Sequence, residues 1–197
     1  MTAVPEGKKS LGAHPYVFPM PVYMISTYCE DDKVDCMAAA WGGICGEKHI
    51  CICLDESHKT AANIKKRQAF TISIPDVAHM PQADYLGVAT ANKVENKFEK
   101  CGLHAVKSTK VDAPIVMEFP ITLECKLLTT SNVTDDFVVI GEIVDVLADE
   151  SVLGEDGKVD ASKINTYAFD TFHHNYYGIG GVVGKAFREG QPYLKKQ

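Results

Sequence analysis

The sequence predicts a mainly β fold, an antiparallel barrel with a few appended helices, and three observations lead to that prediction. Many segments are rich in Val, Ile, Leu and Thr, which favour strands. Few segments carry a helical pattern. Strand and helix patterns do not alternate regularly, as they would in a parallel α/β sheet. Antiparallel strands in this number commonly close into a barrel.

A single domain is the expected organisation. The chain has 197 residues, within the usual range for one domain, and 46% of them are hydrophobic, enough for a sizeable core. We expect one domain over residues 1–197, with residues 1–13 as a loose N-terminal segment. Three prolines between His14 and Pro21 predict extended, irregular chain before the first strand.

The first half of the chain predicts a β-hairpin followed by a strand, a helix and another strand. Residues 22–28 and 34–41 form the hairpin, joined by the polar turn CEDDKVD. The sequence HICICL (49–54) predicts the next strand, and the helix is expected over about 58–68. AFTISI (69–74) alternates with β-branched residues and predicts a further strand.

The second half predicts short helices and then two long strands. Between 75 and 103 the polar, alanine-containing sequence predicts one or two short helices, with Gly102 at the C-terminal cap. Residues 119–130 and 137–148 are rich in Val, Ile, Leu and Thr and predict the long strands. An Asp-Gly turn follows at 156–157.

Charge and composition exclude several classes of function. With 26 acidic and 20 basic side chains the net charge is −6, and no basic run occurs, which argues against nucleic-acid or anionic-membrane surfaces. No apolar stretch approaches the length of a membrane span, and the start lacks an apolar signal region. Gly178 and Gly180 begin a G-x-G pattern, but Val183 replaces the third glycine of a dinucleotide-binding loop. We expect a cytoplasmic protein without a dinucleotide-binding fold.

Cysteine content leaves one alternative open. Seven cysteines make an odd number without the spacing of a disulfide-rich scaffold, so we expect them to be reduced. His49, Cys51 and Cys53 share one face of the predicted strand, which would suit a metal or thiol site together with Cys45. Because zinc ligands normally come from turns and cysteine is often simply buried, we expect no metal.

A possible ligand wall lies between Val34 and Asn63. Ala38, Ala39 and Ala40 leave room beside the sheet for a flat group, and a glycine pair follows them. The next helix, with Ser57 as its expected cap, would aim backbone amides and the Lys59 charge at one anion. A flat hole beside an anion site favours a nucleotide, although tight strand packing and an ordinary helix cap would produce the same pattern.

The ordered motifs of the chain resemble the flavin reductase-like family, and within it the flavoredoxin branch. They are P-x-P-V (19–22), EDDK (30–33), MAAAWGGICG (37–46), ESHKTAANI (56–64), and the segments 83–103, 111–128, 138–150 and 176–190. The resemblance covers most of the chain from about Leu11 onward. It implies an FMN-binding split barrel of Greek-key topology, usually a homodimer with each flavin near the subunit interface.

The resemblance also implies the positions that contact the cofactor. They are Asp35, Met37, Ala38, Ala39, Ala40, Trp41, Ser57, His58, Lys59, Thr60, Asn63, Thr90, Ala91 and Lys97. Asp35 and Ala38 stand where the family strand motif N-x-M-T-x-x-W has Asn and Thr. Thr90 and Ala91 replace a Ser-Gly pair, and Lys97 is the retained cation of a D-K-F motif.

Other positions depart from the family pattern or stay unassigned. Asp55 and Glu56 occupy places where the family has basic residues, and Lys59 is the hypothesised replacement for that charge. A lost hydrogen bond would cost about 0.5–1.5 kcal/mol, so weaker FMN binding is expected rather than none. His173, His174, Tyr176 and Tyr177 form an aromatic and polar cluster, for which a dimer interface is preferred over cofactor contact.

Three functions remain in competition at this stage. The first is an FMN-binding redox protein, either an NAD(P)H-dependent flavin reductase or a carrier that passes electrons to a redox protein partner. No catalytic side chain is expected, because the flavin ring itself accepts and donates electrons. The second is a non-catalytic binding module with a degraded flavin pocket. The third is the metal or thiol protein considered above.

Overall fold

The structure is a computed structural model and describes residues 4–132 and 136–194. The strands are β1 (Met20–Pro21), β2 (Tyr23–Tyr28), β3 (Val34–Ala39), β4 (Gly42–Gly46), β5 (His49–Leu54), β6 (Ala69–Ile74), β7 (Ala105–Lys107), β8 (Pro114–Val116), β9 (Ile121–Asn132), β10 (Phe137–Ala148), β11 (Tyr167–Phe169) and β12 (Tyr176–Gly178). The helices are α1 (Lys59–Arg67), α2 (Met80–Val88), α3 (Lys97–Lys100), α4 (Ala161–Ile164) and α5 (Gln191–Leu194), with short 3-10 turns η1 (Val77–His79) and η2 (Glu150–Val152).

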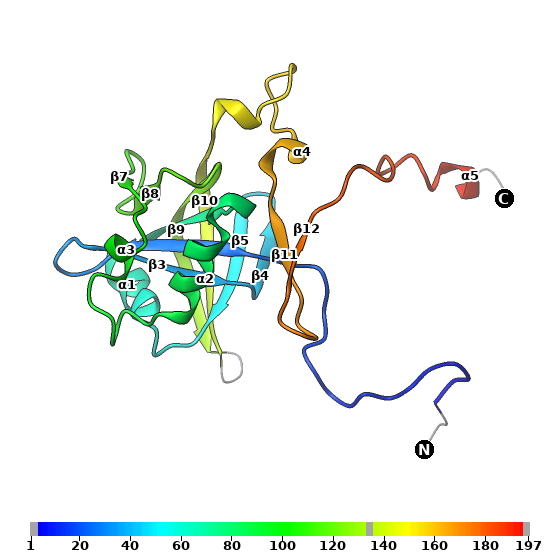
Figure 1. The fold of residues 1–197 in the computed structure, drawn as a ribbon, viewed down its shortest axis with the longest axis horizontal. Helices are drawn as coiled ribbons and strands as arrows, with labels where there is room; N and C mark the ends of the chain where they lie inside the picture. Colours follow the sequence, from blue (N-terminus) through cyan, green and yellow to red (C-terminus); the bar gives the residue numbers. More distant parts are fainter. Residues whose placement is uncertain (1–3, 133–135, 195–197) are drawn as a thin grey trace.

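A seven-stranded antiparallel sheet forms the body of the molecule. Its strand order is β3-β2-β6-β9-β10-β5-β4, so β3 and β4 are the two edge strands (Figure 1). Only Ala40 and Trp41 separate these two edges in sequence. The sheet must therefore roll up so that its two edges come near each other, and the Cys53 amide, which donates to the Trp41 carbonyl at 2.8 Å, extends the β4–β5 pairing back to Trp41. The predicted antiparallel barrel with few helices is confirmed.

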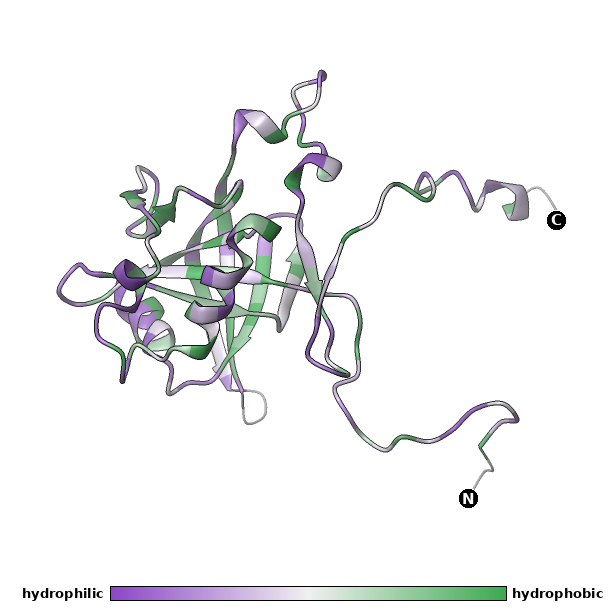
Figure 2. Ribbon diagram, viewed as in Figure 1, coloured by the Kyte–Doolittle hydropathy of each residue, from purple (hydrophilic) through white to green (hydrophobic). Residues whose placement is uncertain are grey.

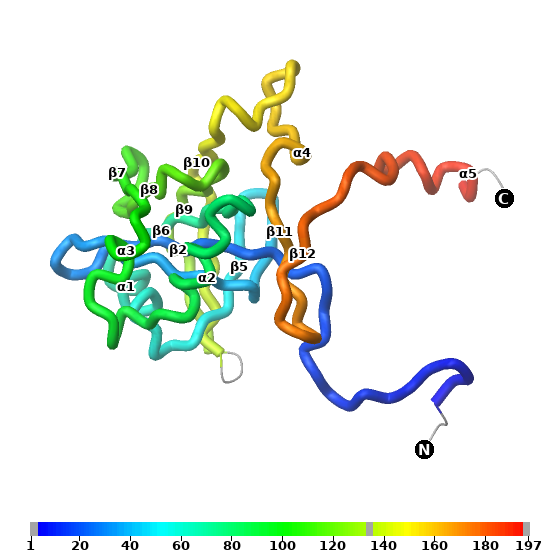
Figure 3. The backbone as a smooth tube through the Cα atoms, in the orientation of Figure 1, coloured from blue at the N-terminus to red at the C-terminus, as the bar shows by residue number. Residues whose placement is uncertain are grey.

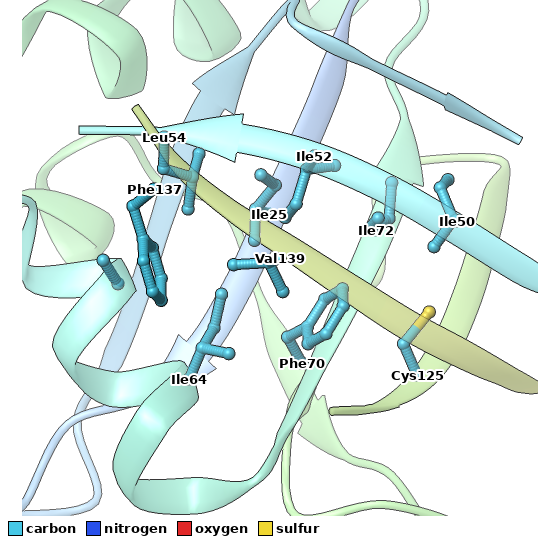
Figure 4. Packing of buried hydrophobic residues seen from close by; sticks show 11 residues of the cluster. Ile25, Ile50, Ile52, Leu54, Ile64, Phe70, Ile72, Cys125, Phe137 and Val139 are labelled. Atoms are coloured by element: carbon cyan, nitrogen blue, oxygen red, sulfur yellow. The ribbon is translucent and has the colours of Figure 1, made fainter. Parts of the chain in front are cut away.

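The barrel core is made from side chains of five strands and of α1. Ile25, Ile52, Ile72 and Val139 meet at its centre, and Figure 4 shows them facing Ile64 from the helix. Because α1 turns Ala61 and Ile64 inward and ends in Lys65, Lys66 and Arg67, it closes the barrel with its apolar face and keeps its charges outside. Basic residues in the last turn also complement the helix dipole.

Most predicted elements lie where the sequence places them, with two corrections near the barrel junction. The first hairpin is β2 and β3, paired from Tyr23–Ala39 to Tyr28–Val34. Its second strand ends at Ala39 and not at Trp41, and the glycine pair that follows starts β4. The N-cap of α1 is His58 and not Ser57, and no side chain caps the helix.

The predicted end of the helical region is confirmed, and part of one predicted turn lies outside the described residues. Gly102 has a φ of +71° directly after α3 and Cys101. This left-handed conformation suits glycine at a helix end. The long strands β9 and β10 pair along their length, but residues 133–135 of the turn between them are outside the described range.

A small second sheet joins the two ends of the chain. Its order is β1-β11-β12, and Figure 3 shows the N-terminal segment running beside the β11–β12 hairpin. Thr171 both accepts from the Val17 amide and donates to the Val17 carbonyl. Beyond this sheet both chain ends extend from the body, with apolar and polar residues interspersed along them (Figure 2). The body and the ends therefore differ in how much they contribute to the core.

The cysteines and helices of the structure bear on two earlier predictions, the metal or thiol site and the membrane span. All seven cysteines are free. His49, Cys51 and Cys53 do share the outer face of β5, but no group of three or more His, Cys, Asp or Glu in the described residues could hold a metal ion. In the same part of the chain, no helix has the length and apolar character needed to cross a bilayer.

Candidate functional site

Three adjoining cavities lie along β3, and we call them together the β3 cleft. Their volumes are about 340, 40 and 240 Å³. Asp35, Lys59, Ala91 and Lys97 line both the first and the second, and Gly87 lines both the second and the third. One wall is β3; the opposite wall comes from the start of α1, from α2 and from the loop that follows α2. The cleft is therefore continuous from the start of β3 to the barrel junction.

The first cavity is the charged end of the cleft. Lys33, Lys59 and Lys97 line it together with several carboxylates. Its residues come from the turn between β2 and β3, from α1 and from residues 91–99. Lys59 takes part in none of the ion pairs found among the described residues, whereas Lys33 pairs with Asp31 at 3.2 Å. Lys59 is therefore the cation at this end that is available to an anionic ligand.

Asp35 and Lys97 are engaged with each other. The Lys97 ammonium lies 3.4 Å from Asp35 Oδ1, with the two side chains 5% and 1% exposed. Thr60 donates to Asp35 Oδ2 at 2.5 Å, and Lys97 also donates to the carbonyls of Leu86 and Ala89 at 3.3 and 3.1 Å. Since these carbonyls end α2, the network fastens the helix to β3. Three residues predicted to contact the cofactor thus contact one another.

The start of α1 lines the middle of the cleft. His58, Lys59 and Thr60 line the middle cavity, and the buried Nδ1 atom of His58 has no hydrogen-bond partner among the described residues. Four amides at a helix start lack partners within the helix, and the helix dipole favours an anion there. This end of α1 can therefore receive a phosphate.

The acidic residues before α1 face away from the cleft. Asp55 accepts the Ser57 amide at 2.8 Å, and Glu56 pairs with Lys65 and accepts from Asn132. These bonds hold the pKa of both carboxyl groups below their usual values. The Ser57 carbonyl accepts from Asn92 at 2.9 Å, which fastens the loop after α2 to the start of α1. Neither carboxylate lines the cleft; the carboxylates that do line its charged end are Glu30, Asp31, Asp35, Glu95 and Glu99.

The third cavity is the aromatic end of the cleft. It is lined by Val22, Ala38, Ala39, Ala40, Trp41, Asp84, Gly87, Val88, Phe169 and Tyr176. Trp41 is 43% exposed, and its ring centroid lies 6.4 Å from that of Phe169. A Cβ at Gly87 would meet the Ala38 Cβ at 3.0 Å, so small residues are required where α2 approaches β3. The cavity is mostly apolar and open to solvent.

The structure gathers most of the predicted site residues at this cleft. Asp35, Met37, Ala38, Ala39, Ala40, Trp41, His58, Lys59, Thr60, Thr90, Ala91 and Lys97 line it. Ser57 is exposed outside it, and Asn63 is buried behind it, where it donates to Thr27 at 3.0 Å. Whether the lining residues contact a cofactor stays a prediction.

Sequence reasoning missed the far wall. Asp84, Gly87 and Val88 come from α2, and Phe169 comes from β11; none of them was proposed. Of the unassigned C-terminal cluster, Tyr176 lines the aromatic end, and His174 stacks on Phe169 at 5.8 Å. The aromatic richness of that segment was the available signal, but its packing against β3 depends on the small sheet, which the sequence did not predict.

The fold is a mainly antiparallel split barrel with few helices. Residues 16–174 match the family described as Flavin reductase like domain, and the chain belongs to that family. The structure is similar to flavoredoxin of Desulfovibrio vulgaris (Miyazaki F), with a TM-score of 0.87 and 40% sequence identity over 93% of this chain and 99% of that one. The predicted family and its flavoredoxin resemblance are confirmed.

Two more distant structures share the fold. Flavoredoxin from Methanosarcina acetivorans gives a TM-score of 0.86 at 21% identity, covering 94% of this chain and 98% of that one. An FMN-binding domain of a flavin reductases-like enzyme from Shewanella baltica OS155 gives 0.72 at 23% identity, covering 84% and 88%. At these identities the likeness supports the split-barrel fold alone.

Proposed function

We propose that this protein binds FMN in the β3 cleft and transfers electrons through it. The observation that carries the proposal is the change in polarity along the cleft, from the start of α1 and Lys59 to the mostly apolar cavity beside Trp41 and Phe169. The six residue-to-residue steps from Asp35 to Trp41 span up to roughly 20 Å at about 3.3 Å per step. FMN has the matching form, with a phosphate at one end and a flat ring at the other.

The residues present fit this group. The amides at the start of α1, the Lys59 charge and the His58 Nδ1 atom would hold the phosphate; among the described residues Lys59 forms no ion pair and His58 Nδ1 has no hydrogen-bond partner. The third cavity, beside Ala39 and Ala40, would take the ring, and Trp41 and Phe169 would shield it from water. When bound, FMN supplies hydride and single-electron transfer, and the chain supplies binding, orientation and exclusion of water.

Two kinds of electron transfer share this site. An NAD(P)H-dependent flavin reductase consumes reduced nicotinamide steadily when free flavin is supplied. A flavoredoxin-type carrier is reduced reversibly and passes electrons to a redox protein partner. The absorbance of NADH and NADPH, followed in the presence of excess FMN, separates the two kinds of protein. Steady consumption of the nicotinamide assigns a reductase. No consumption, together with reversible reduction by dithionite, assigns a carrier.

The phosphate end of the proposal is tested by Lys59→Gln. Loss of a charge-assisted contact of about 1.5–3 kcal/mol should raise the FMN dissociation constant about ten- to a hundredfold, measured by quenching of flavin fluorescence. Lys65→Gln is the matched control, because Lys65 lies at the other end of α1 and pairs with Glu56. An unchanged FMN affinity in Lys59→Gln would contradict the placement of the phosphate at the start of α1.

A second function is favoured by one specific observation. Because Thr60 donates to Asp35 Oδ2 and the Lys97 ammonium lies 3.4 Å from Asp35 Oδ1, three polar groups predicted to contact the cofactor are already engaged with one another. A non-catalytic module with this cleft would bind another planar ligand or none. Failure to retain FMN after reconstitution would support that function over the redox one.

The proposal includes the assembly and the compartment. We expect a homodimer, in which the second copy would cover the solvent side of the aromatic end. Seven free thiols are consistent with a reducing compartment, so a cytoplasmic location is part of the proposal. No nucleic-acid or membrane partner is included.

A further inference from the structure

Two oxygen-bearing side chains face each other at the aromatic end of the cleft. Among the residues lining that cavity, only Asp84 and Tyr176 have them. Asp84 projects from α2 and Tyr176 from β12, so they approach from elements more than 80 residues apart. Side-chain hydrogen bonding to a ligand's oxygen at this end must therefore involve this pair or the Trp41 indole.

The Tyr176 hydroxyl is a hydrogen-bond donor whose acceptor in this structure is Asp84. It donates to Asp84 Oδ1 at 2.9 Å. Burial, then the hydrogen bond and the charge of Asp84, raise the pKa of Tyr176 to about 12. Tyr176 therefore keeps its proton at neutral pH and offers a neutral O–H group.

A second tyrosine is placed to replace Tyr176 at Asp84. Tyr167 is 3% exposed, and its hydroxyl has no hydrogen-bond partner among the described residues. Its ring meets that of Tyr176 edge-on with centroids 5.0 Å apart. Tyr167 therefore packs directly against the residue that donates to Asp84, and burial, then the charges of Tyr176, Asp84 and Asp76, raise its pKa. A buried hydroxyl without a partner is unfavourable, so Tyr167 gains by donating to Asp84 whenever Tyr176 leaves it.

We infer that, when a ligand enters the aromatic end, Tyr176 breaks its hydrogen bond to Asp84 and Tyr167 donates to Asp84 in its place. The Tyr176 hydroxyl then donates a hydrogen bond to a carbonyl oxygen on the edge of the ligand's conjugated ring. Asp84 disfavours an anionic group here, and the flat wall of alanines favours a planar one. The inference deepens the proposed function and rests on it. The ring carbonyl has two sources, the flavin itself or a second small molecule such as an aromatic ketone.

The test compares wild type with Tyr176→Phe, which keeps the ring and removes only the hydroxyl. Lumiflavin, a flavin ring without the phosphate chain, is titrated into the apoprotein and followed through Trp41, the single tryptophan. Phenazine, a tricyclic ring without a carbonyl, is the matched ligand. Fluorenone, an aromatic ketone, is titrated into the FMN-loaded protein and followed through the visible flavin spectrum.

We expect Tyr176→Phe to weaken one carbonyl ligand about tenfold and to leave phenazine unchanged. An effect on lumiflavin assigns the flavin as the source, and an effect on fluorenone assigns a second molecule. If wild type and Tyr176→Phe bind both carbonyl ligands with equal affinity, or if the substitution weakens phenazine equally, the inference is overturned while the proposed function stands. Wild type that binds neither FMN nor lumiflavin would overturn the proposed function as well.

A separate experiment tests the exchange of Tyr176 for Tyr167 at Asp84. Tyr167→Phe should weaken the same carbonyl ligand in the wild-type background and have no further effect in Tyr176→Phe, because the replacement donor matters only when Tyr176 moves. A loss of the same size in both backgrounds would contradict the exchange.

Discussion

Among the ion pairs of the described residues, Asp35 and Lys97 alone are both buried. The sequence placed both at the cofactor, but the structure gives each a partner. A buried pair of this kind adds little to stability compared with apolar residues, yet breaking it leaves an uncompensated charge. The main effect of the pair on stability is therefore seen when one partner is removed and the other charge stays buried.

Asp35→Asn should lower the free energy of unfolding by about 3–5 kcal/mol, because it leaves the Lys97 ammonium buried without its counter-charge. Urea denaturation measures this loss. Asp31→Asn removes the exposed partner of Lys33 and should change stability by about 0–1 kcal/mol. Equal effects of the two substitutions would show that Lys97 is solvated rather than buried.

The buried thiols give an expectation for pH. Burial raises the pKa of Cys36 and of Cys125 to about 12, so both stay protonated in the folded protein when the unfolded chain begins to ionise near pH 9. Their contribution to stability is present below pH 9 and is lost as pH rises toward 12. Cys36→Ala should flatten this part of the stability curve, measured by urea denaturation from pH 8 to 11. A curve as steep as wild type would contradict the assignment to Cys36.

Exposed and buried thiols should also differ in reactivity. Cys45 is exposed, whereas Cys36 and Cys125 are buried. We expect a maleimide at pH 7.5 to label Cys45 in the native protein and to label the buried pair only in denaturant. Peptide mass spectrometry reads the positions, and early labelling of Cys36 would show that the barrel opens readily.

Among the elements, β10 is shaped by one glycine beside the core. The register between β9 and β10 shifts at Gly141, and a Cβ there would meet Phe70 Cζ at 2.5 Å. Gly141→Ala should therefore destabilise the fold by about 1–3 kcal/mol through overpacking. Gly43→Ala in β4 is the control, since nothing lies within 4 Å of its added Cβ. Thermal unfolding of both variants checks this, and equal midpoints would contradict it.

The element pattern shows what local sequence could and could not predict. Strands such as β6, β9 and β10 were predictable because β-branched residues and alternation mark them directly. β4 was missed, because its glycines resemble a turn and its strand conformation comes from pairing with β5. Ser57 was expected to cap α1 because of its residue type, but the N-cap position is one residue later, at His58, and no side chain caps the helix.

The whole molecule has chain ends that contribute little to its own core. Val182, Val183 and Phe187 are at least 92% exposed. Deleting residues 179–197 should therefore leave the thermal midpoint of the monomer unchanged, measured by circular dichroism at low protein concentration. A large drop would show that this segment folds back onto the barrel.

The homodimer implied by the family resemblance stays a prediction. Sedimentation equilibrium should give twice the chain mass of 21.5 kDa. Repeating it after the deletion of residues 179–197 shows whether the exposed apolar side chains of that segment join the two copies. A monomer at all concentrations for the full chain would contradict the expected assembly.

About half of the candidate site could be predicted from the sequence, for a physical reason. The β3 wall and the start of α1 are contiguous segments, so their small residues and helix start are visible locally. The opposite wall of Gly87, Phe169 and Tyr176 comes from segments far apart, brought together by α2 and the small sheet. The engagement of Asp35 with Lys97 was equally invisible, since it depends on where α3 lies against β3.

The visible absorption spectrum of the purified protein, after incubation with FMN and removal of excess ligand, tests the central claim most directly. The charged and aromatic ends of the β3 cleft should together retain the cofactor, so oxidised-flavin bands should persist through gel filtration in proportion to protein. A spectrum without those bands would contradict FMN binding and would assign the cleft to a different ligand.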